Sequence, residues 1–523
     1  MDNLECLSEF FDSGSAETEK SFLNDVFVTT EDFLSIIKPK NNTLKILVGN
    51  KGSGKSALLG YLKDRAEKLD IPVIQLTPTD FPEWNFSENA SPASMISNIY
   101  ASILKAMALE LGIRQKGLLS DDDNRLLQEA IREGVREPTA VSKILNIIMP
   151  IGKAVTKIDF KEMLPSYAFT SASRERVVSS YMKDRKVFYV LLDDIDQICN
   201  ACRSDYYDVI WAEVLALLKI AINIPNIVPI VSVRREIWRK LSINNGNRDK
   251  YDQIRNMVCT LRSDREKLKC ILERRLLFCK ERYEIKSNNL YDAFFEGEDC
   301  QVPNSLERRR WYDYLISSSR ENPRDLIQLV SFLVRNAQKK MASRISDVDV
   351  ENTALKYSEE RVGDLIQQNE DMFSKIEPLI RSFSLATFEM QPEELRKHLS
   401  DFLGQGNIIF NGKTIKLLDD KVIKVWDLLF NIGFINPRAI DNTQKRGYSF
   451  IPYDETLVSW TRWNDVQKYT WDIHPCYRVF LYNLKEEEKK RIQNKDVGEN
   501  YKGKTTTLQR KQKKGRIREY RRR

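Results

Sequence analysis

A glycine-rich stretch near the N-terminus has the residue types that bind a nucleoside triphosphate. Residues 49–56 match the phosphate-binding pattern GxxxxGK[ST] in full. Glycines let the backbone turn its N–H groups toward phosphate oxygens, Lys55 would reach the β- and γ-phosphates, and the Ser56 hydroxyl would coordinate Mg²⁺. The sequence therefore predicts a site for ATP and Mg²⁺. The residues predicted to bind the nucleotide are Gly49, Asn50, Lys51, Gly52, Ser53, Gly54, Lys55, Ser56 and Ala57.

A second polar group follows an apolar segment much later in the chain. Residues 187–192 are apolar, and Asp193 and Asp194 come directly after them. A P-loop needs a carboxylate from a neighbouring buried strand to complete the magnesium shell. We therefore expect Asp193 to lie on the magnesium side and Asp194 to polarise the attacking water. The plain alternative is that these carboxylates only begin a loop.

A third segment, residues 225–235, is rich in β-branched residues and predicts another central strand, although a proline at position 229 weakens that prediction. Its polar end contains Ser232, Arg234 and Arg235. Many ATPases of this kind place a γ-phosphate sensor at such a strand end, so Ser232 is a candidate. Alternatively, the arginines cap the following helix or pair with one of the aspartates that follow residue 192.

The elements around these motifs indicate an α/β fold. Apolar residues 44–48 predict a strand before the P-loop, residues 57–69 have helical spacing, and residues 71–76 predict a second strand. Strands that alternate with helices in this way form a parallel sheet. Because Lys55 and Asp193 are far apart in the sequence, we expect a largely helical insertion at about residues 88–180.

The remaining domains follow from changes in this pattern. We predict an ATPase core over residues 1–235, a helical lid over 236–355, a winged-helix-like domain over 356–505 and a basic tail over 506–523. The winged-helix prediction rests on a helix followed by two short strands around a turn. That candidate recognition helix, at 418–430, has more acidic than basic residues, which favours contact with a protein or weak contact with DNA. The nearby aromatic residues Trp460, Trp463, Tyr469 and Trp471 could stack on bases, but core positions are more usual.

The overall composition is that of a soluble globular protein of 523 residues. The sequence contains no run of about 18 consecutive apolar residues, which a membrane span would need. The acidic N-terminus does not match a secretory signal. We therefore expect a cytosolic protein without a membrane partner. The net charge of +8 equals the excess in residues 510–523, which have nine basic residues against Glu519. This tail could bind nucleic acid, or it could be a solubilising terminus.

With these motifs, the chain resembles the AAA+ class of P-loop ATPases, its origin-recognition-like branch and the related signal-transducing (STAND-like) ATPases. Most AAA+ proteins have glutamate at the position of Asp194, whereas the origin-recognition-like and signal-transducing ATPases resemble this chain in having aspartate there. This difference leaves the hydrolysis rate open. In such proteins an arginine that begins a lid helix contacts the γ-phosphate, and by position that is Arg324. Alternatively, Arg324 pairs with a neighbouring carboxylate, either Glu321 or Asp325.

The segments at residues 15–19, 51–58 and 272–276 and the Arg234 strand resemble more closely a bacterial P-loop ATPase family often found with antiviral defence genes. The resemblance implies a slow ATPase that acts as a molecular switch. The catalytic residues it implies are Lys55, Asp193, Asp194, Ser232 and Arg324. It also implies a homo-oligomer and a protein partner with the effector activity. The alternatives are a DNA-binding AAA+ loader or initiator and a pseudo-ATPase scaffold.

Overall fold

A computed structural model gives the fold of most of the chain. It describes residues 3–30, 33–34, 36, 43–81, 84, 86–87, 90–114, 126, 130, 170–183, 187–197, 205–244, 253–320, 322–404, 406–410, 412–443, 447–451, 453–454 and 456–491. The chain divides into two compact units. The first, called the P-loop unit below, comprises Asp12–Arg282 and Glu321–Ile327, and the second unit comprises Met1–Phe11, Tyr283–Arg320 and Gln328–Arg523.

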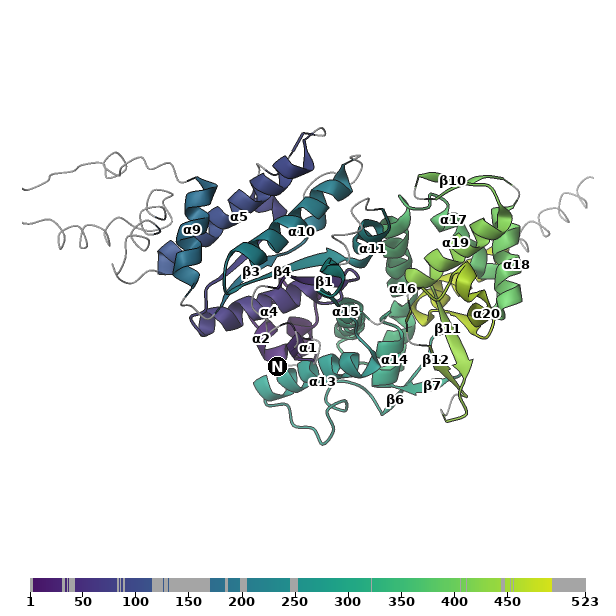
Figure 1. Ribbon diagram of the computed structural model, residues 1–523. Coiled ribbons are helices and arrows are strands. Elements are labelled where there is room, and N and C mark those ends of the chain that lie inside the picture. The colour runs from purple at the N-terminus through teal and green to yellow at the C-terminus, as the bar shows by residue number, and fades with distance from the viewer. Residues whose placement is uncertain are drawn as a thin grey trace, which may run out of the picture. The chain divides into compact units, whose positions relative to one another are not determined.

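A five-stranded parallel sheet forms the centre of the P-loop unit (Figure 1). Its strands are β1 (Lys45–Gly49), β2 (Val73–Leu76), β3 (Phe188–Leu192), β4 (Ile227–Arg234) and β5 (Val258–Thr260). They lie in the order β2-β3-β4-β1-β5. Strands covered on both faces are largely apolar, as β3 is throughout and β4 is from Ile227 to Val231. The predicted α/β P-loop core is confirmed.

Strand β4 lies between the P-loop strand and the acidic strand. We expected the strand before Asp193 to neighbour the P-loop strand, but β4 separates β3 from β1. In the register of the sheet, Gly49 is opposite Arg234 and Leu192 is opposite Val231. The carboxyl ends of β1, β3 and β4 therefore lie together at one edge, where the polar residues that follow them can meet.

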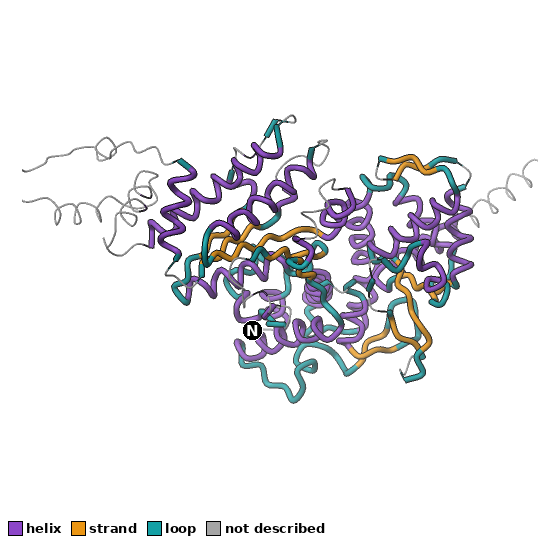
Figure 2. The backbone as a smooth tube through the Cα atoms, viewed as in Figure 1, coloured by secondary structure: helices purple, strands orange, loops and turns teal. Residues whose placement is uncertain are grey.

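Helices cover both faces of this sheet (Figure 2). On one face lies α4 (Lys55–Lys68), whose apolar side chains pack with alternate residues of β1, β3 and β4. On the other face lie α5 (Pro92–Arg114), α9 (Ser171–Met182) and α10 (Tyr206–Asn223), in a larger core. Because side chains alternate along a strand, Leu47 joins the first core and Ile46 joins the second.

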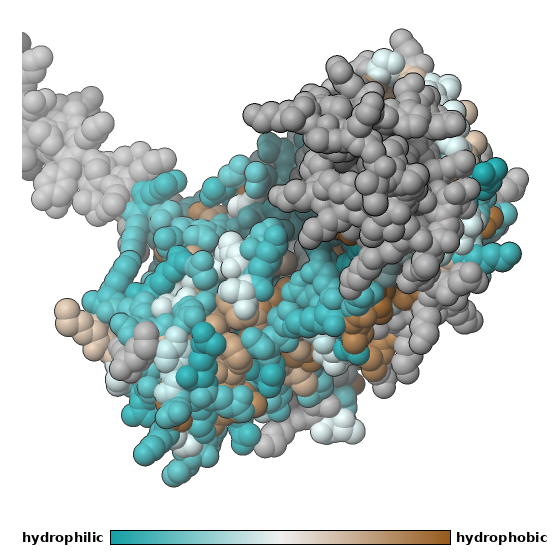
Figure 3. Space-filling view, turned by 90° about the vertical axis from the view of Figure 1, so that its left-hand side faces the viewer, coloured by the Kyte–Doolittle hydropathy of each residue, from teal (hydrophilic) through white to brown (hydrophobic). Residues whose placement is uncertain are grey.

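Part of the predicted insertion is helical, namely α5 and α9. Most of the rest, residues 115–169, lies outside the described residues except positions 126 and 130. Helix α5 is the one described helix long and apolar enough to cross a membrane. Nine of its residues are buried, in a core shared with α10. We therefore interpret α5 as a core helix. On the face shown in Figure 3 the described side chains are mainly hydrophilic, with smaller hydrophobic areas between them.

Five further elements complete the described part of the P-loop unit. They are α2 (Leu23–Val26), η1 (Pro78–Asp80), η3 (Ile195–Gln197), α11 (Arg235–Asn244) and α13 (Arg265–Arg282). Helix α15 (Pro323–Lys339) begins in this unit and continues in the second unit.

The described part of the second unit consists of helices and small antiparallel sheets. Its helices are α1 (Asn3–Phe10), α14 (Trp311–Ser317), α16 (Asp347–Asn369), α17 (Ile376–Ser382), η4 (Phe383–Leu385), α18 (Pro392–Leu403), α19 (Leu418–Asn431), η5 (Trp460–Arg462) and α20 (Trp463–Val466). Its strands are β6 (Asp299–Gln301), β7 (Arg308–Arg310), β8 (Glu389–Met390), β9 (Ile408–Phe410), β10 (Lys413–Ile415), β11 (Ile435–Ile440), β12 (Tyr448–Phe450) and β13 (Thr470–Ile473). Residues 475–491 are also helical.

Helix α19 is followed by an antiparallel pair, β11 and β12, in a sheet of order β12-β11-β13-β8. This arrangement is the one that led us to predict a winged helix, which stays a prediction. The basic residues 445 and 446 of the turn and the tail at 506–523 lie outside the described residues. Trp471 is fully buried, whereas Trp460 is half exposed, so only the second could stack on a ligand.

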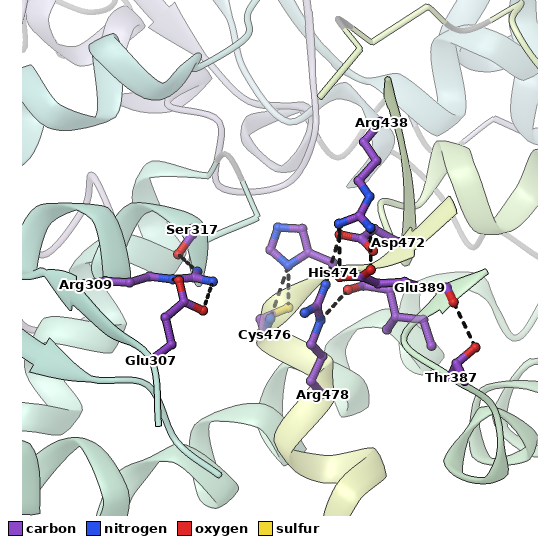
Figure 4. A network of polar contacts seen from close by, with 11 residues as sticks. Glu307, Arg309, Ser317, Thr387, Glu389, Arg438, Asp472, His474, Cys476 and Arg478 are labelled. Carbon is purple, nitrogen blue, oxygen red and sulfur yellow. Dashed lines mark hydrogen bonds and ion pairs between the residues drawn. The ribbon is translucent and has the colours of Figure 1, made fainter. Parts of the chain in front are cut away.

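A buried carboxylate ties this sheet together (Figure 4). Asp472 of β13 lies 3.5 Å from Arg438 of β11 and 3.1 Å from Arg478, measured between carboxylate oxygen and guanidinium nitrogen. Arg438 also donates to Glu389 of β8 at 3.0 Å. Burial raises the pKa of Asp472, and the two arginines oppose that rise. The ion pairs therefore join three of the four strands.

Candidate functional site

The P-loop connects β1 to α4 with a backbone that only glycine adopts easily. Gly52 has φ +85° and Gly54, the residue before α4, has φ +94°. L side chains disfavour this left-handed region, which explains the glycines of the motif. The turn places the first N–H groups of a 14-residue helix at the carboxyl edge of the sheet, where an anion is favoured.

Lys55 is held inside the loop that it belongs to. Its ammonium donates hydrogen bonds to the backbone oxygens of Gly49 at 3.0 Å and Asn50 at 3.2 Å, and the residue is 7% exposed. Burial lowers the pKa of Lys55, while the carboxylates of Glu236 and then Asp193 oppose this change. Lys55 is thus a buried donor next to the P-loop backbone. Glu236, in the first turn of α11, is a neighbour that sequence reasoning missed.

Asp193, Asp194 and Ser232 form one hydrogen-bonded group where β3 and β4 end. The Ser232 hydroxyl donates to Asp193 Oδ1, and the Asp194 N–H lies 3.0 Å from the same oxygen and 3.2 Å from Ser232 Oγ. Asp194 has φ +50°, a conformation that costs energy unless surrounding contacts stabilise it. Asp194 lines the cavity described below, whereas Ser232 is fully buried.

The acidic residues around Asp194 are electrostatically linked. Burial raises the pKa of the Asp194 carboxyl, and the carboxylates of Asp193 and Asp196 raise it further, against Arg234 and Lys55. The Arg234 guanidinium lies 2.9 Å from Asp196, so one of the alternative pairings suggested from the sequence is present. Arg234 also lines the cavity, which leaves it close enough to respond to an anion there.

Glu213 of α10 lies behind this group. The residue is completely buried, and neither carboxyl oxygen has a hydrogen-bond partner within the described part of the chain. Burial raises the pKa of Glu213 well above its usual value, and Asp196 adds to the rise. Burial thus favours the neutral form of Glu213, which places no additional negative charge beside the ion pair of Asp196 and Arg234.

A cavity of about 380 Å³ within the P-loop unit is lined by Lys55, Asp194 and Arg234 among other residues. Seven basic side chains line it, namely Lys51, Lys55, Arg234, Arg262, Lys267, Arg275 and Arg324. Three acidic side chains oppose them, namely Glu17, Glu19 and Asp194. The excess of positive charge beside a P-loop matches a polyphosphate ligand.

The donor set also fits Mg²⁺. Ser56 lines the cavity and Asp193 is 5% exposed at the end of β3. Among the described residues, no group of three or more His, Cys, Asp or Glu side chains could hold a metal ion on its own. Magnesium is usually bound through one or two carboxylates together with substrate phosphates and water. Ser56 and Asp193 would therefore hold it together with the triphosphate, where it would neutralise the charge that develops during transfer.

Apolar residues also line the cavity, and sequence reasoning missed them. Leu23, Val26, Phe27, Val28 and Phe33 come from the segment before the P-loop. Tyr61 of α4 stacks on Phe27 at 4.3 Å between ring centroids. An apolar, aromatic wall suits a nucleobase. The aromatic residues at 27 and 33 are visible in the sequence, but their spacing alone does not bring them to the P-loop.

A buried ion pair attaches this N-terminal segment to α13. The Arg275 guanidinium donates to both carboxylate oxygens of Glu19, at 3.1 and 2.5 Å, and both residues are almost completely buried. The neighbouring Arg274 donates to the Asp25 backbone oxygen at 2.8 Å. Because Glu19 and Arg275 both line the cavity, the pair helps to define its wall. Sequence reasoning noted these segments only as part of a resemblance.

Arg324 lies in the first turn of α15 and also lines the cavity. Its Nε donates to the Gly14 backbone oxygen at 3.3 Å. Glu321, one of the partners considered for it, lies outside the described residues. The cavity therefore brings Lys55, Ser56, Asp194 and Arg324 together, while Asp193 and Ser232 lie behind Asp194. The catalytic roles of these residues stay predictions.

Comparison with known proteins gives partial matches. The family described as FunZ-associated C-terminal helical domain matches residues 266–366, which include most of α13 and all of α14 and α15. The 80.3 kDa protein of transposon gamma-delta of Escherichia coli (strain K12) is 23% identical over 498 residues, which cover 92% of this chain and 68% of that protein. The second match covers most of the chain, and neither match establishes a family.

Solved structures with some similarity include three archaeal proteins. The Aeropyrum pernix ORC2 protein, solved as ADPNP–ADP complexes, is 13% identical, with 90% of this chain and 94% of that chain covered and a TM-score of 0.35. The Walker-type ATPase PABY2304 of Pyrococcus abyssi is 11% identical, with coverages of 90% and 99% and a TM-score of 0.39. The A. pernix ORC1 protein, solved in complex with DNA, is 14% identical, with coverages of 90% and 92% and a TM-score of 0.29. Such TM-scores support no argument about function, which must come from the site.

Proposed function

We propose that this chain is a molecular switch that binds ATP with Mg²⁺ and hydrolyses it slowly. The observation that carries the proposal is the cavity, because it joins a complete P-loop to Asp194, Arg234 and Arg324. ATP would contribute negative charge that the basic lining matches, and its γ-phosphate would lie within reach of residues from three separate segments. Binding of ATP rather than ADP would then change the position of those segments relative to one another.

Asp194 is the candidate for polarising the attacking water. Asp194 lines the cavity, and burial, followed by the carboxylates of Asp193 and Asp196, raises the pKa of its carboxyl. A carboxylate that is protonated more easily than usual loses its basic form at a higher pH. As a general base Asp194 must be ionised, so turnover should fall as the pH falls through the raised pKa of its carboxyl.

Replacing Asp194 with asparagine should lower kcat about 100-fold, because general-base catalysis typically contributes at least that much. The variant should also lose the acid limb of the pH–rate profile, since asparagine does not titrate. Phosphate release measured across a pH series gives both results. The matched control is Asp208→Asn, which changes an exposed aspartate of α10 and should leave the profile as it is. An unchanged acid limb in Asp194→Asn would show that another group is the base.

Arg324 is the candidate for sensing the γ-phosphate. Hydrogen bonds to charged groups contribute about 1.5–3 kcal/mol, so Arg324→Ala should weaken binding of a non-hydrolysable ATP analogue at least about tenfold. Its ADP affinity should change less than about twofold, because ADP lacks the γ-phosphate. Isothermal titration of both nucleotides tests this, with Arg335→Ala of the same helix as the control. An equal loss for both nucleotides would assign Arg324 a structural role.

The proposal includes a homo-oligomer that forms with ATP and a partner protein with effector activity. Light scattering with the ATP analogue and with ADP tests the homo-oligomer. The switch requires that the protein have a larger molecular mass with the ATP analogue than with ADP. The role in antiviral defence rests on resemblance alone. Its test is whether cells expressing the chain with its neighbouring genes resist phage infection and lose that resistance with Arg324→Ala.

A second candidate is a DNA-binding loader or initiator of the AAA+ type. The observation that favours it is the succession of α19, β11 and β12, which is the order of a winged helix. Duplex binding measured over a salt series, with and without residues 510–523, separates the two. Tight binding without the tail would favour the loader, whereas weak binding that needs the tail would favour the switch.

A further inference from the structure

Asn322 makes two hydrogen bonds that connect the P-loop with the start of α15. Its Nδ2 donates to the Lys51 backbone oxygen at 2.7 Å, and its Oδ1 accepts from the Arg324 N–H at 3.0 Å. A backbone oxygen can only accept and a backbone N–H can only donate, so the two partners determine the orientation of the amide. One side chain thus contacts the phosphate-binding loop and the arginine that lines the cavity.

The P-loop backbone approaches Asn322 and Arg324 very closely at Gly52. A Cβ atom at Gly52 would lie 2.6 Å from Asn322 Oδ1 and 2.9 Å from Arg324 Cβ, so no larger residue fits without movement. The Arg324 N–H is also 3.4 Å from the Gly52 backbone oxygen. The contact is therefore between main chains, with the Asn322 amide filling the space beside them.

A second glycine, Gly14, also lies in close contact with Arg324. At Gly14, which has φ +66°, a Cβ atom would lie 3.2 Å from both Cα and Cγ of Arg324. The Gly14 backbone oxygen accepts from Arg324 Nε. Arg324 thus lies between two glycine backbones, and Asn322 contacts one of them.

The hydrogen bond to Lys51 has a consequence for phosphate binding. The Lys51 carbonyl and the Gly52 N–H belong to one planar trans peptide and point in opposite directions. Because Asn322 binds the carbonyl, the Gly52 N–H must point away from Asn322. Asn322 itself is not among the residues that line the cavity, whereas Lys51, Gly52 and Arg324 are.

We propose that Asn322 is a positioning residue that couples the P-loop to Arg324, so that triphosphate binding at the loop and γ-phosphate contact by Arg324 occur together. This inference rests on the proposed ATP site. Asn322 does not touch the nucleotide. One rigid amide thus fixes the orientation of two backbone groups, the peptide between Lys51 and Gly52 and the N–H of Arg324. Loss of that amide would lower the preference for ATP over ADP.

The test compares two substitutions that separate coupling from helix capping. In Asn322→Ser the hydroxyl still accepts from the Arg324 N–H, as serine does at many helix N-termini, but it is too short to reach Lys51. In Asn322→Ala both hydrogen bonds are lost. Neither variant changes the charge. The measurement is the ratio of the affinities for a non-hydrolysable ATP analogue and for ADP, by isothermal titration.

Coupling predicts that both variants lower this ratio about tenfold, and that neither lowers it further when Arg324→Ala is already present. A role in capping alone predicts that Asn322→Ser keeps the wild-type ratio, and that result would overturn the proposal. Independent effects of Asn322→Ser and Arg324→Ala that multiply would also overturn it. Thermal unfolding of each variant confirms that the compared proteins are folded.

Failure of the proposed function gives a different result. If the wild-type chain bound neither nucleotide, or if Lys55→Ala bound both as the wild type does, the ATP site itself would be refuted. If wild-type binding were normal and depended on Lys55 while Asn322→Ser kept its ATP preference, only the coupling would be refuted.

Discussion

Lys55→Ala should abolish high-affinity ATP binding. The Lys55 ammonium is buried and already makes two hydrogen bonds to the P-loop backbone, so its position is established before a phosphate arrives. Truncating one partner of a buried, hydrogen-bonded charge pair costs about 2–5 kcal/mol, which corresponds to roughly 30- to 5000-fold in affinity. Isothermal titration with ATP and Mg²⁺ measures the change directly.

The control for Lys55→Ala is Lys68→Ala, which removes an exposed lysine from the last turn of the same helix and lies outside the cavity. Its affinity for ATP should stay within about twofold of the wild type, since exposed charges contribute little. The assignment of the site would be wrong if Lys55→Ala bound ATP as tightly as the wild type.

Breaking the buried pair of Glu19 and Arg275 should have the largest effect on stability. Glu19→Gln keeps the size of the side chain but leaves the Arg275 guanidinium without its counter-charge in a buried position. Removing one partner of a buried pair costs about 3–5 kcal/mol, a large part of the free energy of unfolding of a typical domain. Urea-induced unfolding of the variant and the wild type gives the difference.

The control for Glu19→Gln is Asp70→Asn, which removes a charge of similar size from an exposed pair. The carboxylate of Asp70 lies 3.2 Å from Arg114, and its side chain is 79% exposed. That change should cost less than about 1 kcal/mol, because water screens such pairs. The double variant Glu19→Leu with Arg275→Met should recover most of the lost stability, since no uncompensated charge stays buried. A Glu19→Gln protein as stable as the wild type would contradict this account.

The parts of the site that could be predicted from the sequence are those encoded in one short segment. The P-loop needs glycines, a lysine and a hydroxyl at consecutive positions, and these requirements are visible without a fold. The strand before Asp193 was likewise visible as an apolar run that ends in carboxylates. Such local patterns also predicted the α/β fold, because the alternation of apolar strands and helices restricts the architecture to a few classes.

The parts that could not be predicted depend on which distant segments meet. The position of β4 between β1 and β3 is a property of the sheet order, to which no residue spacing corresponds. Glu19 and Arg275 are separated by 256 positions, and Asn322 and Lys51 by 271. A single sequence contains no signal for such pairs, since glutamate, arginine and asparagine are common on any surface. Ser232 was visible as a polar strand end, but its contact with Asp193 was not.

The cavity wall also sets the order of events while the chain is made. Its lining begins at Gly14 and is complete only at Ile327. At about 5–20 residues per second, a ribosome needs about 15 to 60 seconds between those two positions. For most of that time the P-loop has been synthesised but Arg324 and the residues of α13 that complete its site have not. A nascent chain therefore cannot capture nucleotide with full affinity until synthesis has passed Ile327.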